Sequence, residues 1–95
     1  MIIAVVRIRL RLPSRTLKEK RAIVKSTLER LRTRFNASVA EVDDLDSVGL
    51  ATIAAACLSN EAAHAEQQVA AIAGAIAEWR LDAEVLEIET ELIHV

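Results

Sequence analysis

Two segments at opposite ends of the chain alternate apolar with charged side chains, and these segments constrain the fold most. Within residues 2–12 the apolar positions alternate with Arg7, Arg9 and Arg11, and within residues 83–95 they alternate with Glu87, Glu89 and Glu91. A period of two is typical of a strand with one buried and one open face. If the two strands are neighbours, their opposite charges meet. Matching the two patterns predicts opposed residue numbers that sum to about 98, with Arg9 opposite Glu89.

Between these strands the pattern predicts two helices and two further strands. Pro13 ends the first strand, and Thr16 with Glu19 has the spacing of a capping box at the start of a helix over residues 17–35. A second helix is expected over residues 61–80, with an apolar stripe that ends near Trp79. The remaining strands are expected over residues 37–42 and 48–58. The alanines of 48–58 also suit a helix, but its position after a short strand and an acidic turn favours a strand.

The predicted order of elements is therefore strand, helix, strand, strand, helix, strand. This βαββαβ order predicts an α+β, ferredoxin-like fold, in which two helices cover one face of a four-stranded antiparallel sheet with strand order 4-1-3-2. The 95 residues suffice for one modest core, so residues 1–95 are expected to form a single domain. No internal repeat or linker interrupts it.

Composition narrows the functional classes. One Cys excludes an internal disulfide and favours a reducing compartment. The apolar start is too short for a secretory signal, and no apolar run approaches the length of a membrane span. We therefore expect a cytoplasmic protein without a membrane partner.

The charges divide unevenly along the chain. Residues 1–35 contain 11 of the 12 Lys and Arg residues and 2 of the 14 Asp and Glu residues, a balance of +9. Residues 36–95 contain one Arg and 12 acids, a balance of −11. Such a division indicates either internal pairing between the two halves or a basic surface for an anionic partner.

The strongest candidate site is the basic start of the first helix. Its cations are Arg15, Lys18, Lys20, Arg21 and Lys25. Cations oppose the helix dipole at an N-terminus, whereas free amides there attract anions, so this concentration suggests a site for phosphate or carboxylate groups. The alternative is a solvated helix face. Further along the helix, the cations at Arg30, Arg32 and Arg34 suit the dipole, which favours a solvated face, but together with the helix start they could also lie along an RNA backbone.

Other candidate sites have simpler explanations. Asp43, Asp44 and Asp46 lack the spacing of a calcium loop and are expected to serve the turn itself. The remaining candidates are Cys57, His64 and His94. Their spacing does not match that of zinc ligands or of a catalytic nucleophile and its base. Cys57 is expected to be a small core residue. We therefore expect no catalytic residue, no metal ligand and no cofactor, and an enzyme is the least supported class.

The open face of the predicted sheet has two further possibilities. The first and third strands contain no aromatic residue, so base stacking on the sheet is not expected. The face combines charges with small apolar side chains, among which we place Val39, and could pair two copies of the chain. Trp79 is expected either to seal the helix layer or to lie at such an interface.

Three parts of the sequence resemble the YlxP-like family of small bacterial proteins of unknown function. They are Ser14 to Arg21, Arg34 to Asp43, and the pair Ser59 and Asn60. The resemblance spans nearly the whole chain and implies a ferredoxin-like fold and a bacterial cytosolic protein. The family's genes often lie beside genes for translation and ribosome maturation, and the family assigns no catalytic residues. The chain departs from its relatives at residues 47–50, where they tend to have an aromatic residue and basic residues.

The function expected from these features is non-enzymatic binding of structured RNA or a ribosomal precursor through the first helix. One alternative is a dimeric regulatory domain that binds a small acidic metabolite near the same helix start. Another is a structural subunit of a protein complex. Salt-dependent RNA binding, a metabolite-dependent thermal shift and a stoichiometric protein partner would distinguish the three.

Overall fold

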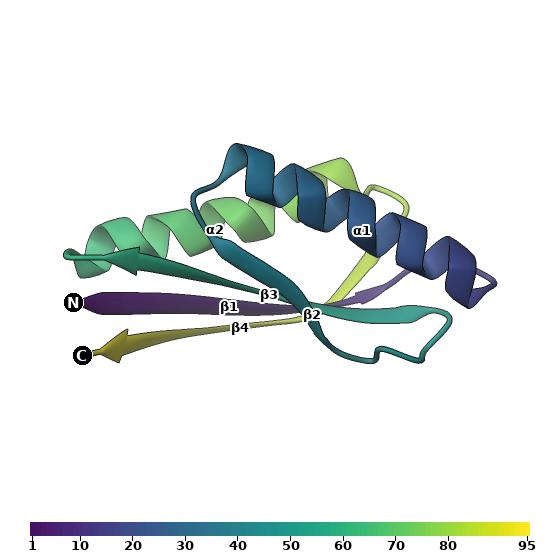
Figure 1. The fold of residues 1–95 in the computed structure, drawn as a ribbon, viewed down its shortest axis with the longest axis horizontal. Coiled ribbons are helices and arrows are strands. Elements are labelled where there is room, and N and C mark those ends of the chain that lie inside the picture. Colours follow the sequence, from purple (N-terminus) through teal and green to yellow (C-terminus); the bar gives the residue numbers. More distant parts are fainter.

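The computed structural model describes all 95 residues as four strands and two helices (Figure 1). In chain order they are β1 (Ile2–Arg11), α1 (Leu17–Arg34), β2 (Ser38–Asp43), β3 (Leu50–Ser59), α2 (Ala62–Trp79) and β4 (Glu84–His94). Each predicted element is present, with ends within two residues of those expected. The alanine-rich segment that also suited a helix is the strand β3.

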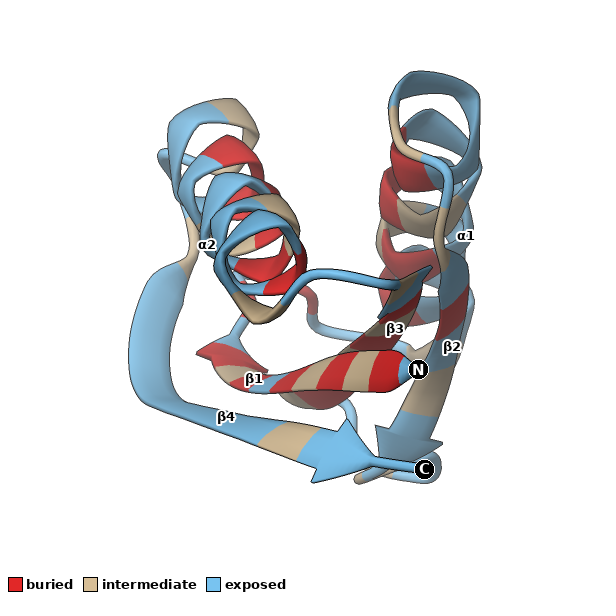
Figure 2. Ribbon diagram, turned by 90° about the vertical axis from the view of Figure 1, so that its left-hand side faces the viewer, coloured by how far each residue is buried: buried red, intermediate tan, exposed pale blue.

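The four strands form one sheet in the order β2-β3-β1-β4, and every neighbouring pair is antiparallel. Both helices lie on the same face of this sheet, and the opposite face is open (Figures 1 and 2). The predicted ferredoxin-like fold and strand order are confirmed.

The pairing of β1 with β4 is confirmed, but the predicted register is wrong by two residues. Arg9 lies opposite Glu87, not Glu89, and a bulge follows between Arg9 and Leu10. Because the shift is even, the arginines and glutamates still share the open face. The observed register places Ile8 directly opposite Ile88 on the helix side, so apolar contacts accompany the charge pattern.

The core lies between the sheet and the two helices. Alternate residues of β1 and β3 face Val24 and Leu31 of α1 and Ile72 of α2, and all are buried. Val39 was expected on the open face, but it is buried in this core. The reason is register: Val39 pairs with the buried Ala55 and so shares its face.

The first turn of α1 has the expected cap with one difference. The Glu19 amide donates to Thr16 Oγ1 at 3.1 Å, as predicted. The Glu19 carboxylate accepts from the Arg15 amide at 3.0 Å instead of the Thr16 amide. The segment that carries Arg15 is thereby fixed against the start of the helix.

The helix layer covers β4 only in part. Helix α2 packs mainly on β1 and β3 and less on β4, where Leu92 contacts the core, and α1 packs on β2. Nearly every residue of β4 is exposed (Figure 2). Strand β4 is therefore held mainly by its backbone pairing with β1.

Candidate anion-binding face of helix α1

Four of the five predicted cations lie exposed at the start of α1. Arg15 precedes the helix, and Lys18, Arg21 and Lys25 follow at spacings of three and four residues, which place them on one face of α1. We call Arg15, Lys18, Arg21 and Lys25 the basic face of α1. No carboxylate pairs with these four side chains, since the ion pairs of the structure involve other cations.

Lys20 does not belong to this face, which corrects the predicted site. Its side chain is fully buried, and its Nζ lies 2.6 Å from Oε2 of Glu41. The same Nζ donates to the carbonyl oxygens of Asp44 at 2.7 Å and Leu45 at 3.3 Å. A ligand at the surface therefore cannot reach this ammonium group. One sequence signal could have found it, because Lys20 lies four residues before Val24 on the buried stripe of the helix.

Asp44 is the centre of the neighbouring polar contacts. It has a φ of 59°, the left-handed region that Asp tolerates better than most residues. Its carboxylate accepts from Thr52 Oγ1 at 2.7 Å and from Arg9 Nε at 3.1 Å. These two hydrogen bonds, Thr52 first, lower the pKa of Asp44, and the bond to Asp44 raises the pKa of Arg9. The acidic turn thus serves the fold, as predicted, and Asp43 Oδ1 accepts from the Asp44 amide at 2.8 Å.

The arginines of β1 pair with acids of the second half of the chain, but mostly not with the expected partners. Arg7 lies 3.5 Å from Asp43, and Arg9 reaches Asp44. Arg11 alone pairs across to β4, with Glu84 at 3.0 Å. Ion pairs between the two halves are therefore present, and most of them involve the end of β2 and the residue that follows it.

The cations in the second half of α1 also have partners within the fold. The Arg30 guanidinium lies 4.2 Å from the centre of the Trp79 ring, and that of Arg34 lies 5.9 Å from it. Arg32 donates to the carbonyl oxygen of Val39 at 3.1 Å. Trp79 packs against the core and joins the ends of the two helices, so it seals the helix layer. Among the cations of α1 and the residues before it, the four side chains of the basic face are those without such a partner.

Other chemistry-bearing residues are not brought together. Burial raises the pKa of the Cys57 thiol, which lies in the core as predicted. His64 contacts Gln68 at 3.2 Å on α2, and His94 is the last residue of β4. No cluster of three or more metal-ligating side chains forms.

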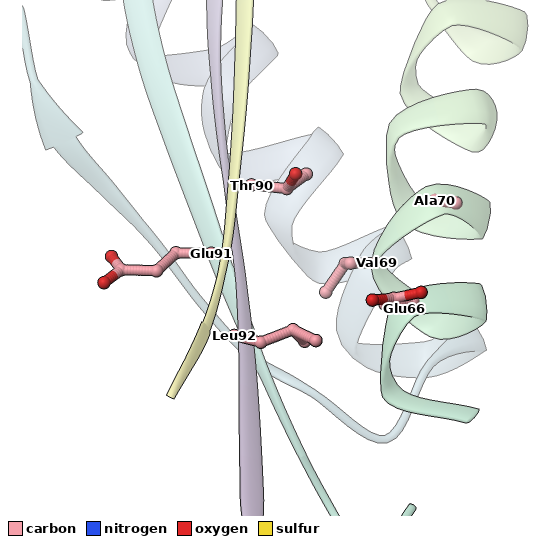
Figure 3. Close-up of a pocket in the computed structure, with 6 residues that line it drawn as sticks. All are labelled: Glu66, Val69, Ala70, Thr90, Glu91 and Leu92. Atoms are coloured by element: carbon pink, nitrogen blue, oxygen red, sulfur yellow. The ribbon is translucent and has the colours of Figure 1, made fainter. Parts of the chain in front are cut away.

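The cavities of the molecule lie away from the basic face. The largest, about 420 Å³, is a groove between α2 and β4 (Figure 3). A second, about 310 Å³, lies over the open sheet face beside Val5 and Arg7. No residue of α1 lines either. The basic face is thus an exposed helix surface rather than a pocket. In addition, neither helix is long and apolar enough to cross a lipid bilayer.

Comparison with protein families gives one match. Residues 3–90 match a family described as proteins of unknown function, DUF503. The chain belongs to this family. The match confirms the expectation of a small protein from a family of unknown function, while the YlxP-like name stays a prediction. No curated protein matches the DUF503 chain.

Solved structures support the fold of this DUF503 chain. The de novo designed protein Foldit4 matches with a TM-score of 0.55 at 18% identity, over 98% of each chain. A Deinococcus radiodurans protein described as an antibiotic biosynthesis monooxygenase matches with a TM-score of 0.51 at 14% identity, over 100% of this chain and 92% of that one. A dimeric ferredoxin-like protein from an uncultured marine organism has a TM-score of 0.47 at 11% identity, over 100% and 96%. At these identities the first two matches bear on the fold alone.

Proposed function

We propose that this DUF503 chain is a non-enzymatic binding protein whose basic face of α1 contacts the phosphate backbone of structured RNA, free or within a ribosomal precursor. The observation that carries the proposal is the distribution of partners among the cations. Eight of the 12 Lys and Arg residues pair with acids, stack on aromatic rings or bond to a carbonyl. The other four form one exposed face.

The shape of this face favours an extended polyanion over a small metabolite. Lys18 and Lys25 are seven residues apart, which is about 10 Å along a helix. No cavity adjoins them that could enclose a small ligand. A row of cations on a convex helix suits successive phosphates of a nucleic-acid backbone.

Two further arguments support RNA as the ligand, bound through its phosphate backbone rather than through its bases. Strands β1 and β3 carry no aromatic side chain for stacking bases, so contacts are expected to be electrostatic. The YlxP-like resemblance implies genes that neighbour translation and ribosome-maturation genes, which favours RNA among the polyanions.

The test is RNA binding as a function of salt. Lys18→Glu with Arg21→Glu is expected to weaken binding of a hairpin RNA and to lower the slope of log affinity against log salt by about 2, because each lost phosphate contact removes roughly one unit. Fluorescence anisotropy at about 50–300 mM salt, a range around physiological ionic strength, measures the RNA affinity and its dependence on salt.

The matched control reverses two positive charges on a different face of the molecule. Arg7→Glu with Arg11→Glu changes two exposed side chains of the open sheet face, and should leave RNA binding nearly unchanged. Absence of binding by the wild-type chain at low salt would contradict the proposal. So would an equal loss of affinity in both double variants.

A pairing of two copies through the open sheet face is a second proposal. One end of this face is apolar, with Leu58 65% exposed and Ile93 37% exposed on either side of Ile3. The other end carries the arginine pairs. Such a dimer leaves the basic face of α1 free, since α1 lies on the opposite side of the sheet (Figure 2).

A further inference from the structure

Strand β4 is an edge strand of the sheet. It pairs with β1 on one side and has no neighbour on the other. An edge strand presents alternate N–H and C=O groups without partners, and natural sheets commonly shorten, twist or cover such edges. This edge is 11 residues long, which is long for an edge that nothing covers.

The side chains of β4 alternate between two chemistries. The helix-side residues include Ile88, which is 51% exposed, together with Thr90 and Leu92. The open-face residues include Glu87, Glu89 and Glu91. Both rows are largely solvent-accessible, because α2 covers β4 only in part (Figure 2).

None of the three glutamates forms an ion pair. Arg7 and Arg9 lie opposite Glu89 and Glu87 in the sheet, but their ion pairs are with Asp43 and Asp44. Glu89 raises the pKa of Glu87 through a hydrogen bond and through its charge, which outweighs the opposing effect of the two arginines. The exposed carboxylates beside the outer edge of the sheet are therefore only partly compensated by the two arginines opposite them.

A groove adjoins the helix side of the same strand. Thr90 and Leu92 point toward α2, where Val69 and Glu66 form the opposite wall, whereas Glu91 points to the other side of the sheet (Figure 3). An additional strand beside β4 would extend the apolar surface of Ile88 and Leu92 at the mouth of this groove.

We infer that β4 accepts an extended segment of a partner protein, in which basic residues alternate with apolar ones, by β-strand addition. Backbone hydrogen bonds to the free edge would hold the segment. Its basic side chains would lie beside the three glutamates, and its apolar side chains beside Ile88 and Leu92. Strand β1, which pairs with β4 on the side opposite the free edge, has the same alternation of basic and apolar residues.

Charge argues against a second copy as the occupant. Two β4 strands paired about a two-fold axis perpendicular to the sheet would place the acidic rows side by side on one face. Like charges in opposed positions destabilise a strand pair. The same glutamates thus disfavour self-association at this edge and favour a basic partner.

The test uses a labelled synthetic peptide in which Arg alternates with Val and Ile over nine residues. Binding by anisotropy, with hydrogen–deuterium exchange of the full chain, should show increased amide protection confined to β4. A peptide of the same composition with its arginines grouped at one end should bind more weakly, because it cannot match both rows.

The matched variant is Glu87→Gln, Glu89→Gln and Glu91→Gln together. These exposed, nearly isosteric changes keep the strand, and should weaken the alternating peptide roughly 3- to 100-fold, the range expected for three lost cross-strand charge pairs. Equal binding of both peptides, unchanged affinity of the triple variant, or protection outside β4 would overturn the inference. Protection of β4 that rises with protein concentration without peptide would assign the edge to a second copy and overturn it as well.

Discussion

Lys20 occupies a position that an amphipathic helix normally gives to an apolar residue. It lies on the buried face of α1 with Val24, Thr27 and Leu31. A buried ammonium group requires compensating acceptors, and here Glu41 and two carbonyl oxygens of the turn after β2 supply them. One side chain thus joins the start of α1 to the hairpin of β2 and β3.

Removing the buried ammonium group of Lys20 should destabilise the folded chain strongly. Lys20→Met leaves the Glu41 carboxylate and two turn carbonyls without a donor, and should lower the free energy of unfolding by about 3–5 kcal/mol, as for other broken buried pairs. Lys20→Met with Glu41→Leu should recover part of that loss, because it removes the unpaired charge. Urea unfolding measures both, and a single variant as stable as the wild type would show that the contact contributes nothing.

Asp44 predicts an effect of acid on stability. Its pKa is lower in the folded chain than its ordinary value of 3.8, so ionised Asp44 stabilises the fold above that pH. This contribution is lost as the pH falls below 3.8 and through the folded pKa. Asp44→Asn tolerates the left-handed backbone but lacks the charge.

The stability difference between wild type and Asp44→Asn should therefore be constant near neutral pH and shrink on acidification below 3.8. Urea unfolding at a series of pH values measures it. The other acids titrate in both proteins, so their effect cancels in the difference. A difference that persists unchanged at the lowest pH would argue against the lowered pKa.

The sequence allowed the exposure of four of the five predicted site residues to be anticipated, and Lys20 shows why the fifth failed. Arg15, Lys18, Arg21 and Lys25 obey the rule that charged side chains lie outside. Lys20 violates it because its acceptors come from a turn more than 20 residues later in the chain. Such a partner cannot be recognised before the fold brings the two segments together.

The secondary-structure elements could be predicted because apolar periodicity is local, whereas the register of β4 could not. Matching Arg9 to Glu89 relied on charge pairs, which are worth only roughly 0.2–1 kcal/mol each. The structure instead combines Ile8 opposite Ile88 with a bulge after Arg9. The arginines then turn toward Asp43 and Asp44, a choice that the alternation pattern does not reveal.

The contact between the helices predicts a modest contribution from one arginine. Arg30 stacks on Trp79 at 4.2 Å, so Arg30→Ala should lower the free energy of unfolding by about 0.5–1 kcal/mol. Trp79 is the sole tryptophan, so its fluorescence reports unfolding of the chain in urea. Arg21→Ala, on the same helix without an aromatic partner, serves as the control. Equal losses in both variants would mean that stacking on Trp79 adds no stability.

For the molecule as a whole, the uneven charge division is in part internal. Arg7, Arg9, Arg11 and Lys20 of the first half pair with acids of the second. The excess that remains is spatially divided, with the basic face on α1 and the acidic row on β4. The surfaces proposed for RNA and for a basic peptide therefore differ in charge and lie on different elements.

The open sheet face predicts the state of assembly. If two copies pair through its apolar end, Leu58→Asp should convert a dimer into a monomer, since it places a charge in the contact. Sedimentation velocity over a range of concentrations measures this. Leu81→Asp, which alters an even more exposed side chain after α2, should leave the dimer intact. A wild-type chain that sediments as a monomer throughout would refute this assembly.

The position of β1 at the centre of the sheet has a consequence for how the chain folds. Its two neighbours, β3 and β4, begin at Leu50 and Glu84, and Ile2 pairs with both Ser59 and His94. Synthesis from the N-terminus makes β1 first, yet its hydrogen bonds on one side require the last strand, β4. Such long-range pairing slows folding, because loop-closure entropy is lost before the contacts form. One edge of the central strand therefore stays unpaired until the acidic strand β4 is made, even after β3 has paired with the other edge.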